Sequence, residues 1–324
     1  MNITLRQLRY ALAAARSGNL SVAAAELHVS QPSLTAAIDS LESQFGQKLF
    51  VRRRGAGAAL TPFGRTVIDQ ARRVLHETRQ LEGLAQSSGE VSGEFVLGCF
   101  DELAPYCAAA LMRRLQERHP KLLVVVREEG FAPLRRLLAE GSVNLALTYD
   151  LDTDSTTQIT VLKEVQPHAL LAAGHALAIR REISLAELAR FPLVLSDQAA
   201  SWQHIIELFR LHGLAPTVYA RTQTFEMQRS LVANGFGVAL VYAEPFGQES
   251  YDGLTLCRLP VKDTLPAQRI VLARDSRYPA TSADDAVTEI ARQWFVHNAG
   301  RPIRAQAAAA RNAANTGRRL RPGK

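Results

Sequence analysis

The chain has 324 residues, which is too long for one average globular core and predicts two or three domains. Apolar residues make up 47% and charged residues 21%, and these proportions exclude an intrinsically disordered chain. The net charge of +7 is uneven: residues 1–86 hold 11 Lys or Arg against 6 Asp or Glu, residues 300–324 hold 7 against none, and the middle is acidic, so an anionic partner is expected for the ends.

The first residues lack the apolar core of a secretion signal, and no later run approaches the ~18 apolar residues of a membrane span. We therefore expect a soluble, cytoplasmic protein that does not contact a membrane.

Residues 5–45 predict three short helices. The first carries an apolar face over residues 5–15 and ends at Gly18. The hydroxyl of Ser21 is expected to cap the second helix. The third helix begins with Ser30-Gln31-Pro32-Ser33, where the proline suits a first helical turn, and carries its apolar residues at steps of three and four. This order is typical of a helix-turn-helix, in which the start of the third helix meets base edges.

Residues 48–54 are β-prone and end in three arginines, and a glycine-rich turn follows at residues 55–57. This pattern predicts a β-wing. In an arbitrary protein such an arginine run is more often a solvated face, but beside a helix-turn-helix contact with DNA phosphates is favoured.

The chain resembles the LysR-type family of bacterial regulators. The motifs that carry the resemblance are Leu8-Arg9-Tyr10, Ala23-Ala24, Val29-Ser30-Gln31-Pro32, Leu41-Glu42, Leu49-Phe50, Leu60-Thr61 and Gly64. The resemblance implies a winged helix-turn-helix, with a departure at Ala36-Ala37, where many members have arginine and a polar residue. The predicted base-reading residues are Gln31, Pro32, Ser33 and Thr35, and the predicted phosphate contacts are Ser30, Arg52, Arg53 and Arg54.

Thr61 and Pro62 predict the start of a long helix whose apolar stripe runs to about residue 86. Pairing with the same helix of a second subunit is the economical explanation, and packing on its own domain is the alternative. Small polar residues at 87–93 predict a hinge, after which a second domain begins at Glu94.

From residue 94 onward, predicted strands and helices alternate, which favours a mostly parallel sheet. Two rounds of this pattern and a final strand and helix over 268–297 predict two α/β lobes, with the chain returning to the first. The resemblance continues here through Gly98-Cys99-Phe100 and the run 231–238. It implies the family's periplasmic-binding-protein-like effector domain. Asn144 and Ala176 depart from the residues that are common in the family at these positions. The expected divisions are 1–61 for DNA binding, 62–93 for linker helix and hinge, 94–165 with 268–297 for lobe one, 166–267 for lobe two and 298–324 for a disordered basic tail.

Small molecules bind at the carboxyl ends of strands in open α/β sheets, so residues at these ends are the candidates for effector contact. For the carboxylates and the serine among them, helix capping or turn formation is an equally good explanation, and the aromatic residues are more often core. The predicted effector-binding residues are Phe100, Asp101, Glu102, Tyr149, Ser196, Asp197, Thr222 and Phe225.

The chain shows no catalytic constellation, and its three cysteines have no metal-ligand or redox spacing. We therefore expect no metal and no cofactor. The sequence predicts a transcriptional regulator that binds double-stranded DNA and a small-molecule effector as a homodimer or homotetramer, with RNA polymerase as a further candidate partner. The alternatives are an enzyme or small-molecule carrier with a DNA-binding head, and an architectural DNA-binding protein without an effector.

Overall fold

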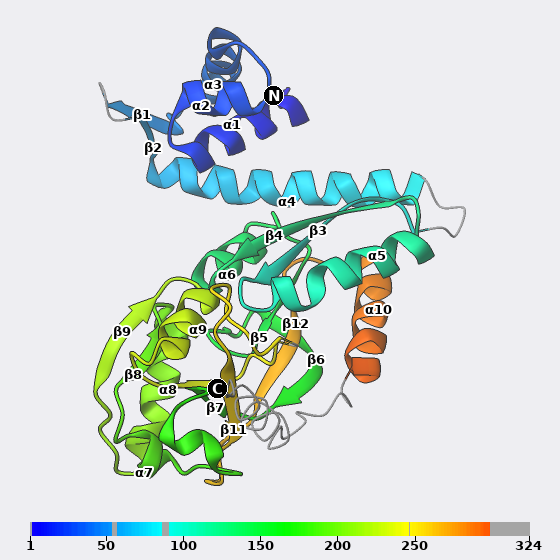
Figure 1. Ribbon diagram of the computed structural model, residues 1–324. Helices are drawn as coiled ribbons and strands as arrows, with labels where there is room; N and C mark the ends of the chain where they lie inside the picture. Colours follow the sequence, from blue (N-terminus) through cyan, green and yellow to red (C-terminus); the bar gives the residue numbers. More distant parts are fainter. Residues whose placement is uncertain (1, 54–56, 86–90, 246, 299–324) are drawn as a thin grey trace, which may run out of the picture.

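The computed structural model describes residues 2–53, 57–85, 91–245 and 247–298. Figure 1 shows a small N-terminal module in blue, the long helix α4 beside it, and a larger α/β body made of two lobes. The N-terminal module has a hydrophobic core separate from that of the body, so the two halves fold around different centres. The expected tail over 298–324 lies, apart from its first residue, outside the described residues.

The N-terminal module is a winged helix-turn-helix, as the sequence predicts. Leu34, Ile38 and Leu41 form the buried face of the third helix, which packs against the first two. The first helix ends at Gly18, which adopts the left-handed conformation. The elements are α1 Leu5–Ser17, α2 Leu20–Glu26, α3 Gln31–Phe45, β1 Phe50–Arg53 and β2 Gly57–Leu60.

The cap of α2 differs from the sequence prediction. The side chain of Asn19 accepts hydrogen bonds from the backbone N–H groups of Ser21 at 2.9 Å and Val22 at 3.4 Å, so Asn19 is the N-cap and Ser21 is not. The asparagine carbonyl reaches these amides because it stands one residue before the helix begins. The hydroxyl of Ser21 donates instead to Gln31 Oε1 at 2.9 Å.

The wing is an antiparallel pair in which Phe50 faces Leu60. A buried carboxylate on α3 holds it in place. Glu42 Oε1 accepts the backbone N–H groups of Leu49 at 2.8 Å and Phe50 at 3.1 Å, and its Oε2 accepts from Lys48 Nζ at 2.6 Å. The start of the wing is therefore tied directly to the recognition helix.

Helix α4, Pro62–Ala85, begins with the cap predicted from the sequence. Thr61 Oγ1 accepts the backbone N–H of Gly64 at 2.8 Å, and the Thr61 amide donates to the carbonyl of Leu49 at 2.9 Å. The backbones approach so closely here that a Cβ on Gly64 would lie 2.1 Å from the carbonyl oxygen of Leu49. Only glycine fits this position without a shift of the backbone.

The apolar stripe of α4 is divided between two environments. Val67, Ile68, Ala71 and Leu75 are buried in the core of the N-terminal module, so the explanation by packing on its own domain holds as far as Leu75. Further along the helix, Leu81 remains 65% exposed. At this position the stripe lacks apolar cover in a single chain.

Lobe one contains a five-stranded sheet in the order β4-β3-β5-β12-β6. The π-helical turn η1 and α5 follow β3, α6 follows β4, and α10 closes the chain on this lobe (Figure 1). Strand β6 was not predicted from the sequence. The bounds are β3 Gly93–Phe100, η1 Ala104–Ala108, α5 Ala109–Arg118, β4 Leu122–Glu129, α6 Phe131–Ala139, β5 Leu145–Tyr149, β6 Thr157–Val165, β12 Gln268–Asp275 and α10 Ser282–Asn298.

The prediction of a mostly parallel sheet holds for four of the five strands of this lobe, and β12 is the exception. Strand β3 pairs in parallel with β4 and β5, but β12 runs antiparallel to both β5 and β6. Strands β5 and β6 therefore point the same way, and the chain leaves the lobe at their carboxyl ends. When it returns from lobe two it enters at that same edge, so β12 must run in the opposite direction.

Lobe two combines an antiparallel sheet, in the order β10-β7-β11, with the parallel pair β8-β9. Strand β11 was also missing from the sequence prediction. The bounds are β7 His168–Ala172, the 3-10 turn η2 Ala176–Ile179, α7 Leu185–Leu188, β8 Leu193–Ser196, α8 Ala199–Leu211, β9 Val218–Thr222, α9 Phe225–Ala233, β10 Ala239–Val241 and β11 Leu256–Pro260. Among the described helices of the whole chain, none is long and apolar enough to cross a membrane.

Candidate DNA-binding surface and effector cavity

The start of α3 presents a small polar surface to solvent. Gln31, Pro32 and Ser33 are exposed, and Thr35 is half-buried. Ser30 caps the helix: its Oγ accepts the backbone N–H of Ser33 at 3.3 Å and lies 2.7 Å from the Ser33 hydroxyl. The two serine hydroxyls therefore bond to one another, and Gln31 carries the longest polar side chain in this group.

The side chain of Gln31 is oriented by its neighbour on α2. Ser21 donates to its Oε1, which leaves the amide Nε2 without a protein partner among the described residues. An amide fixed by its oxygen and free at its nitrogen is suited to donate to an acceptor on a base edge or a phosphate.

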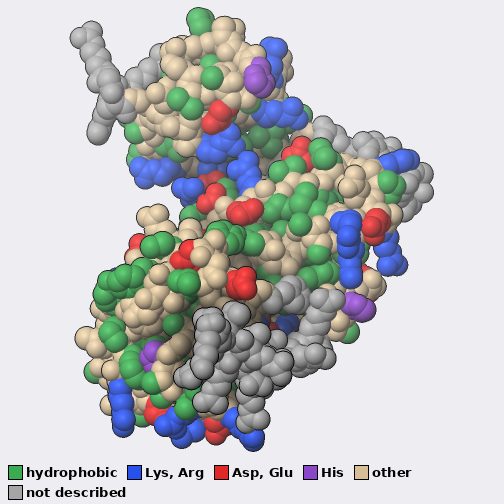
Figure 2. Space-filling view, viewed as in Figure 1, with side chains coloured by type: hydrophobic (Ala, Val, Ile, Leu, Met, Phe, Trp, Pro, Cys, Tyr) green, Lys and Arg blue, Asp and Glu red, His purple; other side chains and the backbone are tan. Residues whose placement is uncertain are grey.

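The predicted phosphate-binding arginines belong to the wing. Arg52 and Arg53 lie on β1, where their backbones pair with Ala58 and Gly57 of β2. Arg54 lies outside the described residues. In Figure 2, further Lys and Arg side chains gather below the N-terminal module, where helix α4 runs.

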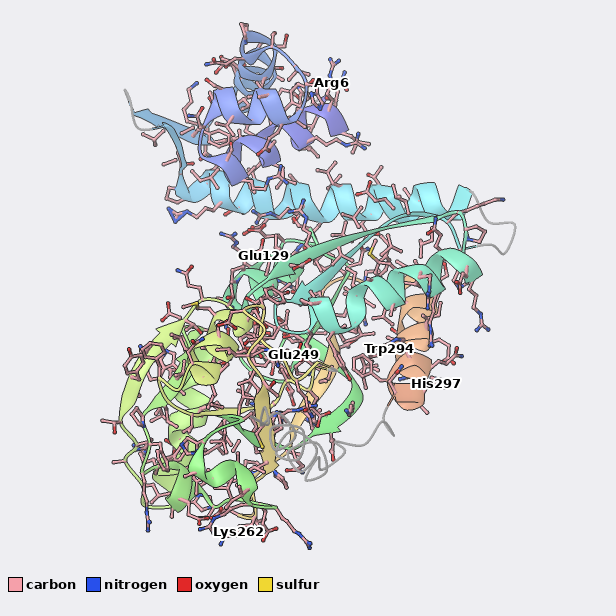
Figure 3. All side chains as sticks on the ribbon, viewed as in Figure 1. Arg6, Glu129, Glu249, Lys262, Trp294 and His297 are labelled. Carbon is pink, nitrogen blue, oxygen red and sulfur yellow. The ribbon has the colours of Figure 1, made fainter. Side chains whose placement is uncertain are left out.

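A cavity of about 560 Å³ lies between the two lobes. Lobe one contributes residues after β3, on β5 and on β6, and lobe two contributes the start of α9 and the segment between β10 and β11. In Figure 3 the labelled Glu249 lies on this segment, between the lobes. The lining residues are Asp101, Glu102, Leu103, Pro105, Tyr106, Glu128, Tyr149, Lys163, Val165, Thr224, Phe225, Glu226, Arg229, Tyr242, Ala243, Glu244, Pro245, Gly247, Glu249, Tyr251 and Ile270.

Half of the predicted effector residues line this cavity: Asp101, Glu102, Tyr149 and Phe225. Ser196 lines a smaller neighbouring cavity of about 40 Å³, which Glu102 and Tyr149 also border.

The other three predicted residues border neither cavity. Phe100 is fully buried and stacks on Phe131 with ring centroids 4.1 Å apart, so it is part of the core. Thr222 is buried, and its hydroxyl donates to backbone carbonyls within lobe two. The side chain of Asp197 is exposed to solvent. Successive side chains at a strand end point to opposite faces, so a strand end alone does not select the residues that turn toward a ligand.

The sequence reasoning missed the lobe-two segment from Tyr242 to Tyr251. This segment follows β10, so the strand-end rule applied to that strand would have found it. Lys163 was missed because it lies on β6, which was not predicted. Tyr106 was missed because it lies in the π-helical turn η1, a rare geometry that is frequent at functional sites.

Both basic side chains that line the cavity are paired with carboxylates. Lys163 Nζ lies 2.9 Å from Glu244 Oε2, and Arg229 Nε lies 2.9 Å from Glu226 Oε2. Burial raises the pKa of Glu102 to about 8, and the nearby Asp101 adds to the rise. At neutral pH, Glu102 is therefore largely protonated while the cavity is empty.

One side chain links the lobes beside the cavity. Gln198, at the start of α8, donates through Nε2 to Asp101 Oδ2 at 2.9 Å and accepts the backbone N–H of Phe131 at 3.3 Å. A Cβ at position 130 would lie 2.3 Å from Gln198 Oε1, so Gly130 makes room for this link. Asp101 also lines the cavity, so a ligand can contact the same carboxylate that accepts the hydrogen bond from Gln198.

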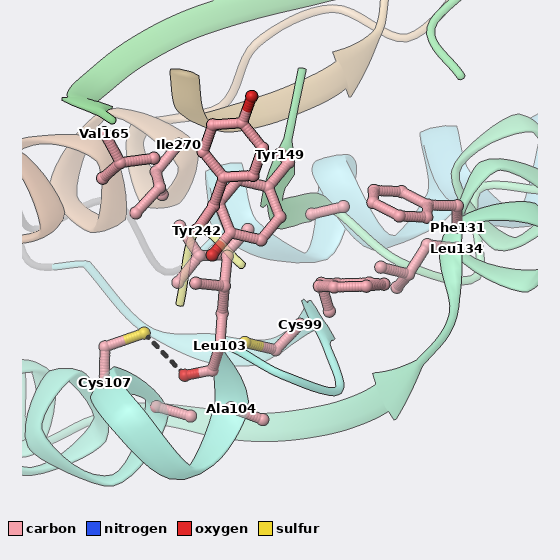
Figure 4. Close-up of a cluster of buried hydrophobic side chains, with 14 of the residues drawn as sticks. Cys99, Leu103, Ala104, Cys107, Phe131, Leu134, Tyr149, Val165, Tyr242 and Ile270 are labelled. Carbon is pink, nitrogen blue, oxygen red and sulfur yellow. Dashed lines mark hydrogen bonds between the residues drawn. The ribbon is translucent and has the colours of Figure 1, made fainter. Parts of the chain in front are cut away.

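The buried nucleophiles and histidine do not form a reactive site. Figure 4 shows Cys99 and Cys107 within the packed core beneath Tyr149, where Cys107 Sγ donates to the carbonyl of Leu103 at 3.2 Å. A hydrogen bond of the Cys99 thiol with Cys107, together with burial, raises the pKa of Cys99. Burial also lowers the pKa of His168 to about 3, which keeps that ring neutral. Within the described residues, no group of acidic, histidine or cysteine side chains has the arrangement of a metal site.

Comparison with known proteins matches both halves of the chain. A family model described as the LysR substrate binding domain matches residues 88–296, and a model described as a bacterial regulatory helix-turn-helix protein of the lysR family matches residues 5–65. The HTH-type transcriptional regulator TdfR of Cupriavidus pinatubonensis is 30% identical over 285 residues, which cover 86% of this chain and 95% of that protein. CysB of Burkholderia cenocepacia, another HTH-type transcriptional regulator, is 27% identical over 259 residues, covering 78% and 82%.

Solved structures show the same architecture. HinK, a LysR family transcriptional regulator from Pseudomonas aeruginosa, aligns with a TM-score of 0.61 and 28% identity over 91% of this chain and 99% of that chain. A full-length variant of OxyR from the same organism aligns with a TM-score of 0.69 and 22% identity over 90% and 98%, and this match supports the fold alone.

Proposed function

This chain belongs to the LysR family of bacterial transcriptional regulators, and we propose that its effector binds in the cavity between the two lobes while the start of α3 reads the operator. The protein is a DNA-binding regulator with a small-molecule effector domain, and it is not an enzyme. The observation that carries the cavity assignment is that both lobes supply its walls, so a bound molecule favours one degree of lobe closure over another.

Gln31 is the proposed base-reading residue, supported by Pro32, Ser33 and Thr35 around it. Its exposed amide is held by Ser21 at the first turn of α3, the part of a recognition helix that meets base edges. Ser30 and the wing arginines Arg52, Arg53 and Arg54 are the proposed phosphate contacts. Phosphate contacts add affinity for DNA of any sequence, whereas a contact of Gln31 with a base edge adds preference for one DNA sequence over others.

Regulators of this family form oligomers, and we propose a homodimer or homotetramer for this chain. The partly exposed apolar side of the second half of α4 supports pairing through this helix. Two recognition helices then meet half-sites about one helical turn, or 34–36 Å, or a multiple of it apart. We further propose that the protein acts in the cytoplasm and contacts RNA polymerase, with residues 1–61, 62–93 and 94–297 as the DNA-binding, linker and effector parts.

A binding experiment tests the DNA-reading proposal. The purified protein is titrated with its own upstream DNA and with unrelated DNA of equal length, at one near-physiological salt concentration. Gln31→Ala is expected to reduce the preference for upstream DNA by about 5- to 150-fold, the effect of ~1–3 kcal/mol at one base contact. Arg52→Ala is expected to weaken binding to both DNAs alike.

Two control variants are matched to these changes. Gln47→Ala alters an exposed glutamine beyond the end of α3, and Arg113→Ala removes an exposed arginine from α5. Both should bind as the unmodified protein does. Equal affinity for the two DNAs in the unmodified protein would favour an architectural role and contradict the proposal.

A further inference from the structure

We propose that the effector of this regulator is an organic cation, a protonated amine with an apolar or aromatic body, held by carboxylates and tyrosine rings in the interlobe cavity. The inference rests on the proposed function, which places the effector in this cavity. It adds the chemical class of the molecule that the cavity takes.

The first support is the charge of the cavity walls. Six acidic side chains line the cavity against two basic ones, Lys163 and Arg229. A cavity with this balance attracts cations and repels anions, and its low-dielectric walls strengthen the effect. The acidic residues are Asp101, Glu102, Glu128, Glu226, Glu244 and Glu249.

Both basic groups are already engaged. Lys163 is paired with Glu244, as described above. Arg229 is 4% exposed, pairs with Glu226, and donates through Nη2 to the backbone carbonyls of Glu249 at 2.6 Å and Gly247 at 3.3 Å. An anionic effector would have to break one of these pairs and leave a carboxylate uncompensated, which is costly in a partly buried site.

The carboxyls of Asp101 and Glu102 are, by contrast, available to a ligand. Asp101 receives only the neutral amide of Gln198 from another side chain. Glu102 has no hydrogen-bond partner in the part of the chain that the structure describes, and its pKa is raised by burial and by the neighbouring Asp101. A bound ammonium group supplies a positive charge and the missing donors.

An independent polar group points to the same place. The hydroxyl of Tyr149, a residue only 3% exposed, is buried without a hydrogen-bond partner among the described residues, although Tyr149 lines the cavity. Buried hydroxyls are nearly always satisfied by protein, water or ligand. The hydroxyl oxygen is closed to solvent in the empty cavity, so a ligand N–H group beside Glu102 can satisfy it once the ring turns toward the cavity.

Aromatic rings complete the recognition chemistry. The cavity is lined by five of them: Tyr106, Tyr149, Phe225, Tyr242 and Tyr251. Tyr149 and Tyr242, labelled in Figure 4, both also border the smaller neighbouring cavity. The negative face of an aromatic ring attracts a cation, and its area covers an apolar body, so rings and carboxylates together favour an organic ammonium group. A cavity of about 560 Å³ has the size of a small-molecule site.

The test is calorimetric titration of the full-length protein with two pairs of probes that differ in charge and share a body. Benzylamine is compared with benzoate, and 1,4-diaminobutane with succinate. We expect at least one amine to bind at one site per chain, and neither carboxylate to bind. Glu102→Gln, which keeps the shape of the protonated side chain, should weaken the amine at least about tenfold, and Tyr149→Phe by a smaller factor.

Glu117→Gln is the matched control, because it neutralises an exposed carboxylate on α5 outside the cavity. It should leave amine binding unchanged, and an equal loss in this variant would attribute the binding to surface charge and overturn the proposal. If the carboxylate probes bind and the amines do not, the cation proposal fails while the cavity remains the effector site. If no probe binds at all, both assignments fail for these classes of molecule. Melting temperatures of both cavity variants, measured without probe, establish that they are folded.

Discussion

Replacement of Glu42 by alanine should loosen the wing from the recognition helix. Glu42 is 5% exposed, and its carboxylate accepts the amides of Leu49 and Phe50 together with Lys48. Removal of the carboxylate leaves two buried N–H groups without an acceptor, each at a cost of ~1–3 kcal/mol, so the N-terminal module should lose ~2–6 kcal/mol of stability. Glu42→Gln, which keeps one acceptor oxygen, should lose less.

Hydrogen exchange on the full-length protein measures this effect where it occurs. The amides of Leu49 and Phe50 should exchange much faster in Glu42→Ala, and affinity for upstream DNA should fall. Both tryptophans, Trp202 and Trp294, lie in the effector domain, so the unfolding transition followed by their fluorescence should not move. Glu26→Ala, which removes a solvent-exposed partner of an ion pair on α2, is the control and should cost less than ~1 kcal/mol.

The effect should depend on pH in a defined direction. Burial alone would raise the pKa of Glu42, but hydrogen bonds from Lys48 and from the amides of Phe50 and Leu49 outweigh it, so the pKa is lowered from its ordinary value. The carboxylate therefore adds stability above its ordinary pKa, and this stability is lost as pH falls through the lower folded value. The difference between the unmodified protein and Glu42→Gln should be full at pH 7 and shrink as the pH falls through the lowered pKa of the folded state. Unchanged exchange at both amides, with unchanged DNA affinity, would refute the reasoning.

Three further substitutions test other contacts. Ser21→Ala should reduce the preference for upstream DNA by about 2- to 10-fold, because Gln31 loses the hydrogen bond that orients it. Binding to unrelated DNA should stay the same. An equal loss of affinity for both DNAs would contradict this prediction. Gly64→Ala should destabilise the N-terminal module by more than ~2 kcal/mol, because the new Cβ would meet the carbonyl of Leu49. Thermal unfolding followed by circular dichroism measures this loss. Gly174→Ala is the control, because a Cβ at that position meets nothing within 4 Å. Gln198→Ala should increase exchange of the first amide of α6 by about tenfold, since the interlobe hydrogen bonds are lost, and unchanged exchange would show that the link does not hold the lobes.

The sequence predicted the elements whose signals are local. The start of α3 at Ser30 and the start of α4 at Thr61 agree with the structure because each hydroxyl acts on an amide three residues ahead. The misplaced cap of α2 is instructive, since Asn19 and Ser21 both have suitable side chains and only the backbone decides between them.

The two missed strands share one property. Strands β6 and β11 are both edge strands, at the ends of their sheets. An edge strand is less buried than a central one, and β6 shows no regular alternation of buried and exposed residues, so its sequence pattern is weak. The direction of β12 depends on how the two lobes meet, and so does the position of the cavity residues between Tyr242 and Tyr251. A short stretch of sequence does not contain this information.

Helix α4 also touches the effector domain at one described ion pair. Arg72 Nη2 lies 3.3 Å from Glu140 Oε1, next to the end of α6, and both side chains are mostly buried. The pair stands ten residues from the start of α4, a lever arm of about 15 Å at 1.5 Å per residue. A tilt of about 10° around Arg72 would displace the N-terminal end of α4 by about 3 Å, close to the rise of one base pair. If α3 reads a half-site as proposed, a modest rearrangement of lobe one would be enough to move it out of register.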